Sequence, residues 1–377
     1  MNKEDFPLLQ NRDITYLDSA CMSLKPEQVL EAVDRYYREF SACPGRSGHS
    51  LSRQTTEMID ESRRKVADFI DAEESEVAFT SGTTEALNLT ANALDQGKVV
   101  VSDKEHNSNL VPWQDREITA LDTENGLDIA KLEKAVDDDA VVSLHHRSNI
   151  DGSELPLEEV SEVVHDNGGV LVVDAAQSVS HTSVSVEDTG ADILAFSGHK
   201  ALGPTGTGVL YVSEEMQDKF RKVKTGGGAV NDTSFRTSDF RSFPHCVEAG
   251  LPNAAGIIGL GAAVDYLENI GMDRIQEHEK RLSELMRKKA AGVEGLQVLG
   301  DRGEGVFSFA FENIGSHQVA EILDTKNIAV RSGRHCVHSW FNSKELQPSF
   351  RASLHLYNDR EDIEEFFSAV EEISVLN

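Results

Sequence analysis

Short apolar runs alternate with helical patterns between about residues 75 and 212, and this alternation restricts the fold more than any other feature. The run VLVV at 170–173 is apolar throughout, which is typical of a strand covered by helices on both faces. The segment 157–167 has a helical pattern and ends at Gly168-Gly169, a stop signal for a helix. The alternation predicts an α/β sandwich with a mainly parallel sheet, whose ligands sit at the carboxyl ends of the strands. We expect strands at 76–79, 99–102, 141–144, 170–174, 193–197 and 208–212, and a further helix at 127–136.

The pattern changes after about residue 254. A long helical stretch runs to about residue 291 with a break near Gly271, and short strands and a final acidic helix follow it. A chain of 377 residues exceeds the usual size of a single hydrophobic core, so two domains are expected. We predict a large domain over 12–263 and a small C-terminal α+β domain over 264–377, with residues 1–11 packing on the small one. The strands expected in the small domain are 306–311, 328–331 and 350–354, and its last helix is expected at 359–373.

The chain is strongly acidic, with 36 Lys and Arg against 65 Asp and Glu and a formal net charge of −29. Nucleic acid and anionic membranes repel such a surface, so neither is expected as a partner. No apolar run has the length of a transmembrane helix, and the first residues lack the apolar core of a signal peptide. We therefore expect a cytoplasmic protein, and a high-salt cytoplasm would explain its charge.

Four cysteines stand at 21, 43, 246 and 336. They form no CxxC pair and no His/Cys group with zinc-finger spacing, so neither a disulfide scaffold nor a metal site is predicted.

Lys200 has an unusual position for a lysine. It ends SGHK at 197–200, directly after an apolar strand and before a glycine-rich turn, whereas lysines are rarely buried without a partner. Desolvation lowers the pKa of a lysine and favours the neutral amine that attacks an aldehyde. The position therefore predicts a lysine that holds pyridoxal 5'-phosphate (PLP) as a Schiff base.

Two further segments fit this chemistry but also have ordinary explanations. Asp174 ends a buried strand, where it is either a capping aspartate or the partner of a protonated pyridine nitrogen. The segment SGTTE at 81–85 opens a helix, and its amides with the hydroxyls of Thr83 and Thr84 would form a phosphate cradle or a plain helix cap. Taken alone, Asp174 is better explained as a capping or turn aspartate, and SGTTE is explained at least as well by a plain helix cap.

Together, Asp174, SGHK at 197–200, SGTTE at 81–85 and EHNSN at 105–109 resemble the class V aminotransferases of the fold-type I PLP enzymes. The chain most resembles the group II cysteine desulfurases, the SufS type, also called selenocysteine lyases. This similarity extends from YLDSA at 16–20 to RASLHLYN at 351–358, nearly the whole chain.

The resemblance implies a role for each matching position. Lys200 would form the Schiff base, Asp174 would pair with the pyridine nitrogen, and His106 would stack on the ring. Gln177 would contact the phenolic oxygen of the cofactor, with Asn149 nearby towards the substrate. Arg351 would bind the substrate carboxylate. The phosphate of the cofactor would be held by Thr83, Thr84, Ser197 and His199.

The segment AVRSGRHCVHS at 329–339 resembles the family's loop with the sulfur-accepting cysteine, which assigns that role to Cys336. Arg331, Arg334 and His335 precede it, and nearby cations favour the nucleophilic thiolate. The other three cysteines lack an equally basic sequence around them, although an inert buried thiol remains the alternative for Cys336. The implied reaction converts L-cysteine to L-alanine and leaves a persulfide on Cys336, a sulfurtransferase step that supplies iron–sulfur cluster assembly.

The resemblance also implies partners. A SufE- or SufU-like acceptor or the SufBCD scaffold would receive the sulfur. The segment GRSGHSLS at 45–52 resembles one that reaches the partner subunit's site, so we expect a symmetric homodimer with Arg46 and His49 contributing.

Several positions depart from the family pattern. The family usually has a threonine at the position of Leu251, and its hydroxyl reaches the cofactor phosphate across the dimer interface. Loss of this charge-assisted hydrogen bond should weaken cofactor binding by ~1.5–3 kcal/mol. The other departures are Asn107, Arg147, Arg334, His338 and Ser339.

Other functions stay open on the sequence alone. One alternative is another class V PLP enzyme, such as a selenocysteine lyase, a C–S lyase or a transaminase. The second is a non-catalytic scaffold or sulfur-carrier relative. The sequence does not choose among cysteine, selenocysteine and cysteine sulfinate.

Overall fold

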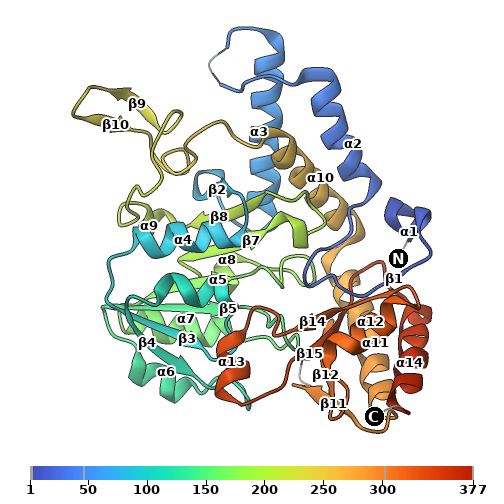
Figure 1. Ribbon diagram of the computed structural model, residues 1–377. Coiled ribbons are helices and arrows are strands. Elements are labelled where there is room, and N and C mark those ends of the chain that lie inside the picture. Colours follow the sequence, from blue (N-terminus) through green and yellow to red (C-terminus); the bar gives the residue numbers. More distant parts are fainter. Residues whose placement is uncertain (1–2, 46, 301–302, 376–377) are drawn as a thin grey trace.

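The computed structural model of the protein describes residues 3–45, 47–300 and 303–375, and a seven-stranded sheet forms its centre (Figure 1). The strand order is β2-β8-β7-β6-β5-β3-β4. All neighbouring pairs from β7 to β4 are parallel, whereas β8 is antiparallel to both β2 and β7. The strands are β2 (Val77–Thr80), β3 (Lys98–Ser102), β4 (Glu117–Leu121), β5 (Ala140–His145), β6 (Val170–Asp174), β7 (Ile193–Ser197) and β8 (Gly208–Val212). The predicted α/β class with a mainly parallel sheet is confirmed.

Helices cover both faces of this sheet, which explains why its strands are apolar throughout. In β6, Leu171 and Val173 pack on one side with the helices α3, α6, α7 and α10, while Val172 packs on the other side with α4. Because successive residues of a strand point to opposite faces, a strand between two helix layers needs apolar residues at every position. These helices are α3 (Ser50–Phe69), α4 (Thr83–Ala93), α6 (Ile129–Ala135), α7 (Leu157–Asp166) and α10 (Ala254–Ile270).

A second, four-stranded antiparallel sheet lies in the C-terminal part, with the order β11-β12-β15-β14. Its hydrophobic core lies between the sheet and the helices α11, α12 and α14. The elements are β11 (Leu296–Leu299), β12 (Val306–Phe311), β14 (Arg331–Gly333), β15 (Ser349–Ser353), α11 (Met272–Ala290), α12 (Ser316–Asp324) and α14 (Arg360–Ser374).

The N-terminal segment joins this C-terminal part. Strand β1 (Thr15–Tyr16) pairs in parallel with β13 (Ile328–Ala329), and Lys3 forms ion pairs with Asp359 and Asp362 at the start of α14. The predicted boundary at 263/264 falls inside α10, whose last turns share a hydrophobic cluster with Leu356 and Tyr357. The division into two domains at that residue stays a prediction.

The structure differs from the expected elements at a few places. The strand expected at 328–331 is divided, because Ile328–Ala329 pairs with β1 whereas Arg331–Gly333 pairs with β15. Edge strand β4 and the hairpin β9 (Val230–Thr233) and β10 (Ser238–Phe240) were not predicted, and their largely exposed residues explain the weak apolar signal. Within the described ranges, no helix is both long and apolar enough to cross a membrane. The remaining helices are α1 (Pro7–Asn11), α2 (Glu27–Arg35), α5 (Asn107–Leu110), α8 (Val186–Thr189), α9 (Glu214–Gln217) and α13 (His338–Ser343).

Candidate active site

A cavity of about 200 Å³ opens where β5, β6 and β7 end and the C-terminal sheet meets the large sheet. This is the edge at which α/β sheets bind ligands. Its lining brings together all eleven residues that the sequence analysis assigned to the site: Thr83, Thr84, His106, Asn149, Asp174, Gln177, Ser197, His199, Lys200, Cys336 and Arg351. Cys21, His145, Arg147 and Arg331 line it as well.

Lys200 enters the cavity from a short helical turn, Gly198–Lys200, that directly follows β7. A Cβ at Gly198 would lie 2.3 Å from Oγ1 of Thr207, so only glycine fits this turn. Burial lowers the pKa of Lys200, and the negative charge of Asp174 opposes this effect. The buried position favours the neutral, nucleophilic amine.

Asp174 ends β6 as a buried carboxyl group. Its Oδ1 accepts a hydrogen bond from the backbone N–H of Ala176 at 3.0 Å. Burial raises the pKa of Asp174, whereas the charge of Lys200 lowers it. A protonated ring nitrogen placed beside this carboxylate would find a counter-charge in a site otherwise poor in solvent.

His145, at the end of β5, is a lining residue that the sequence analysis missed. Its Nδ1 lies 2.9 Å from Oε1 of Glu105, and both side chains are buried. Burial lowers the pKa of His145, but the carboxylates of Glu105, Asp151 and Asp174 together outweigh it, so the net shift is upwards. The pair His145-His146 at the end of an apolar strand was the only signal for it in the sequence.

The start of α4 provides an anion-binding end of the cavity. Gly82, with φ of +149°, precedes the helix and gives it no side-chain cap. Oγ of Ser197 accepts from the backbone N–H of Thr83 at 2.8 Å and lies 2.7 Å from the Thr83 hydroxyl. Gly208 allows the close approach, because a Cβ there would lie 2.4 Å from Cα of Gly82. Helix amides and hydroxyls together suit a phosphate group.

Two neutral imidazoles flank this region. His106 caps α5, and its Nδ1 accepts from the backbone N–H of Ser108 at 3.1 Å. Burial lowers the pKa of His106 to about 3, and the charge of Lys200 adds to the effect. Burial likewise lowers the pKa of His199 to about 4. A neutral ring at His106 is suited to stacking against another ring. Gln177 is also held in place, because its Nε2 donates to the carbonyl of Ala20 at 2.7 Å.

Arg351 provides a buried guanidinium on the opposite side, on β15. Its Nη1 donates to the carbonyl of Asn149 at 2.9 Å, and its Nη2 lies 3.5 Å from Oδ1 of Asp18. Burial lowers the pKa of Arg351 to about 10, so the group stays charged at neutral pH. Its Nε has no hydrogen-bond partner in the part of the chain that the structure describes. Arg351 therefore retains donor capacity for a carboxylate.

Cys336 lies on a loop that several hydrogen bonds hold in place. His335 and Cys336 have φ of 48° and 59°, a conformation that is unfavourable for residues other than glycine. The carbonyl of Cys336 accepts from the backbone N–H of Asn107 at 2.7 Å, and Nδ2 of Asn149 donates to the carbonyl of His335 at 2.8 Å. Two departures from the family pattern also meet here, because Asn107 Nδ2 lies 3.1 Å from Nδ1 of His338.

The basic surround that the sequence predicts for Cys336 needs correction. Burial lowers the pKa of His335 to about 2, with a further contribution from Arg351, so this ring is neutral. Arg334 donates to Oδ1 of Asn342 at 2.8 Å. The guanidinium of Arg331 donates from Nη1 to Sγ of Cys21, a cysteine that the sequence analysis set aside. Proximity along the chain did not reveal the contact of this cation with Cys21.

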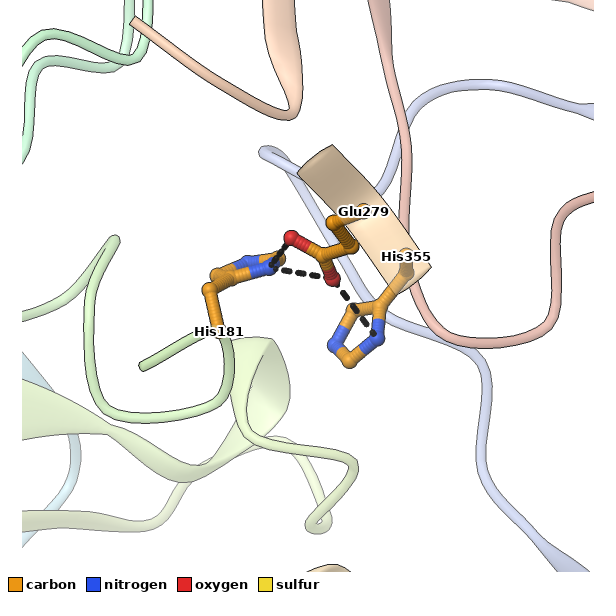
Figure 2. A group of neighbouring side chains, drawn as sticks. All are labelled: His181, Glu279 and His355. Carbon is orange, nitrogen blue, oxygen red and sulfur yellow. Dashed lines mark hydrogen bonds and ion pairs between the residues drawn. The ribbon is translucent and has the colours of Figure 1, made fainter. Parts of the chain in front are cut away.

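Behind the cavity, Glu279 of α11 lies between two histidine rings, His181 and His355 (Figure 2). Nδ1 of His181 lies 2.9 Å from each carboxylate oxygen of Glu279, and Nδ1 of His355 lies 4.0 Å from Oε1. All three are buried, and burial raises the pKa of Glu279 to about 7. The donor types are those of a zinc site, but Nη1 of Arg147 lies 3.9 Å from the second carboxylate oxygen. We interpret these residues, the His181 cluster, as a hydrogen-bonded junction between the two parts of the molecule, and Arg147 as its counter-charge.

Comparison with known proteins agrees with this geometry. Residues 15–366 match the family model of the class-V aminotransferases. A protein of Pyrococcus abyssi named "Probable cysteine desulfurase" is 39% identical and covers 98% of this chain and 96% of its own length. The "Cysteine desulfurase" of Haloferax volcanii is 33% identical, with 98% and 95% covered. The apo structure of the cysteine desulfurase of Thermococcus onnurineus superposes with a TM-score of 0.95 at 37% identity, covering 100% of this chain and 98% of that one. The chain therefore belongs to the class-V aminotransferase family.

Proposed function

We propose that this chain is a PLP-dependent cysteine desulfurase, which converts L-cysteine to L-alanine and leaves the sulfur as a persulfide on Cys336. The observation that carries the proposal is a single cavity lined by a lysine, a buried arginine and a cysteine, namely Lys200, Arg351 and Cys336. Relatives over nearly the full chain are named for this activity.

The residues present fit PLP. The amine of Lys200 would hold the cofactor, the carboxylate of Asp174 would pair with its ring nitrogen, and the start of α4 with Ser197 would hold its phosphate. When bound, PLP supplies an electron sink for negative charge at the substrate α-carbon.

The protein's own groups carry the proton and sulfur steps. Arg351 would bind the substrate carboxylate and fix the α-carbon near Lys200. Burial favours the neutral amine of Lys200, which can take the α-proton onto Nζ. The thiolate of Cys336 then attacks the sulfur of the substrate: a sulfur–sulfur bond forms, the Cβ–S bond breaks, and the carbon takes up a proton to become alanine.

Mass spectrometry of Cys336 after incubation of the holoenzyme with L-cysteine tests the proposal. One added sulfur on Cys336, with alanine as the product, is the expected result. A transaminase or a C–S lyase would leave Cys336 without added sulfur and would keep its activity in Cys336→Ser. Either result would contradict the proposal. Selenocysteine and cysteine sulfinate, offered in parallel, identify the preferred substrate.

The proposal extends to a symmetric homodimer. Leu251 is 75% exposed and lines a second cavity of about 590 Å³ together with Cys43 and Ile59, so apolar surface is available for a partner subunit. Arg46 lies outside the described residues, and Nδ1 of His49 accepts from the backbone N–H of Ser52, so His49 caps α3. Light scattering of the full chain, with Leu251→Asp as the disrupting variant, tests the dimer.

The same proposal places the enzyme in the cytoplasm, with a SufE- or SufU-like protein or the SufBCD scaffold as acceptor for iron–sulfur cluster assembly. Transfer of labelled sulfur from Cys336 to each purified acceptor distinguishes among them.

A further inference from the structure

The cavity contains a second thiol that the proposed function does not use. Cys21 follows Ala20 in the turn after β1 and lines the same cavity as Lys200 and Cys336. Both cysteines are partly exposed and free. Two thiols that face one small cavity can exchange sulfur, provided that one of them carries a persulfide.

The chemical surroundings of Cys21 favour a nucleophile. The guanidinium of Arg331 donates directly to its Sγ. A neighbouring guanidinium stabilises negative charge on sulfur and so favours the attacking form of a cysteine. Cys21 also lies close enough to two other basic groups of the cavity, Lys200 and Arg351, to interact with them electrostatically.

The backbone places Cys21 between the cavity and the surface. On its N-terminal side, the N–H of Ala20 donates to Oγ of Ser353 at 2.9 Å, and the Ala20 carbonyl accepts from Gln177. On its C-terminal side, Met22 is 40% exposed. Backbone hydrogen bonds hold both loops, but the residue that follows Cys336, Val337, is fully buried, whereas the one that follows Cys21 is not.

We propose that Cys21 is a second sulfur-carrying site, which takes the outer sulfur of the Cys336 persulfide. This inference rests on the proposed desulfurase function. The thiolate of Cys21 attacks the terminal sulfur on Cys336; the new bond joins Sγ of Cys21 to that sulfur, and the bond to Sγ of Cys336 breaks. Cys336 leaves as a thiolate with the electron pair, so the exchange needs no oxidant or reductant. Cys336 is then free for a second turnover.

The remaining two cysteines serve as internal controls. Cys43 is exposed and lines the second cavity instead. Cys246 is buried, and burial raises the pKa of its thiol. Sulfur that reaches Cys21 through free persulfide in solution would also reach Cys43, whereas sulfur passed within the cavity would not.

The experiment maps sulfur on all four cysteines. Holoenzyme is incubated with L-cysteine without reductant, alkylated, digested and analysed by mass spectrometry, in the wild type and in Cys336→Ser, Cys21→Ser and Cys43→Ser. The wild type is expected to carry sulfur on both Cys336 and Cys21, about two per protomer, and Cys21→Ser only about one. Cys336→Ser is expected to reduce sulfur on Cys21 at least tenfold, and Cys43→Ser to leave both sites loaded.

Four outcomes would overturn the inference, and none of them contradicts the conversion of cysteine to alanine. Sulfur on Cys336 but never on Cys21 shows that no exchange occurs. Equal sulfur on Cys21 in Cys336→Ser shows direct attack on the substrate by Cys21. A Cys21–Cys336 disulfide with release of sulfide shows attack on the inner sulfur, and equal labelling of Cys43 shows exchange through solution. Absence of sulfur from every cysteine in the wild type would instead contradict the proposed function itself.

Discussion

Two groups of titratable side chains meet where the large and the small sheet join, and they differ in access and in charge balance. The cavity group has Lys200, Arg331 and Arg351 against Asp174 and Asp18, and it is open to a small ligand. The His181 cluster is buried, and its single carboxylate already faces two histidines and the guanidinium of Arg147. Guanidinium groups beside an opening suit the carboxylate of a substrate, whereas a compensated, closed cluster holds two parts of a protein together. The residue types alone do not distinguish the two groups.

The two groups are connected through the turn that carries Lys200. Oγ of Ser180 donates to the carbonyl of Lys200 at 3.0 Å, and the next residue along the chain is His181. A substitution in the cavity is therefore expected to affect chemistry first, and a substitution in the cluster to affect stability first.

The largest effect is expected for Lys200→Ala. The variant loses both the amine that holds PLP and the group that takes the α-proton, and a positioned acid–base group alone contributes about 10²–10⁴-fold. Alanine formation from L-cysteine is expected to fall by at least that factor, and the cofactor absorbance to change, with little change in the melting temperature. Lys222→Ala, at an exposed lysine that does not line the cavity, is the matched control. An active Lys200→Ala would contradict the assignment of the cavity as the catalytic site.

Glu279→Ala is the corresponding test of the cluster. It leaves Nδ1 of the buried His181 without its hydrogen-bond partner, which costs about 1–3 kcal/mol, whereas Arg147 keeps the carboxylate of Glu154 at 3.7 Å. The free energy of unfolding, measured with denaturant, is expected to fall by that amount. KM for L-cysteine in the fraction that remains folded is expected to change little. Glu279→Gln, which keeps a polar group in place, should recover part of the stability. A large KM change at full stability would show that the cluster belongs to the substrate site.

Arg351→Lys is expected to have an intermediate effect on the cavity. A lysine keeps the charge but loses the planar fork that binds a carboxylate with two hydrogen bonds. KM for L-cysteine is expected to rise about tenfold, which corresponds to ~1.4 kcal/mol of binding free energy. Steady-state kinetics with cysteine and with cysteamine, which lacks the carboxylate, separate this role from a structural one. Equal losses with both substrates would exclude carboxylate binding by Arg351.

The last prediction concerns pH dependence within the cluster. Burial lowers the pKa of His355 to about 3. Its contribution to the free energy of unfolding is therefore fully present above the unfolded pKa of 6.5 and is lost as the pH falls towards 3. Burial raises the pKa of Glu279 to about 7, so its contribution has the opposite sign and is lost as the pH rises from 4.5 through 7.

Replacing each residue should therefore change the pH slope in opposite directions. Between pH 4.5 and 6.5, His355→Asn is expected to flatten the rise of the unfolding free energy with pH by up to ~1.4 kcal/mol per pH unit. Glu279→Gln should steepen it. Denaturant titrations at several pH values provide the measurement, and parallel slopes for the wild type and both variants would show that neither group titrates with folding.

The sequence predicted the sheet well where burial on both faces forces apolar runs. Strands β6, β7, β8 and β12 begin and end at the predicted residues. Edge strand β4 escaped prediction because its outer positions are exposed and carry no such pattern. The strand at 328–331 was predicted as one, since its division between two partners depends on β1, more than 300 residues away along the chain.

For the site, the resemblance to the group II cysteine desulfurases selected residues that gather around one cavity, although their roles stay predictions. Lys200, Asp174 and the turn before α4 each end or follow a buried strand, so the topology of a parallel sheet brings them to one edge. That relation is local to each strand and can be read from the sequence.

Only the tertiary structure decided which side chains touch. Arg331 is five residues from Cys336 along the chain, yet its guanidinium contacts Cys21, which a parallel pairing of β1 and β13 brings beside it. Glu279 and His181 likewise meet across 98 residues. Periodicity and local motifs predict which residues of a segment are buried, because burial acts on each segment separately. The contacts of charged groups depend on how distant segments are packed, and no single segment contains that information.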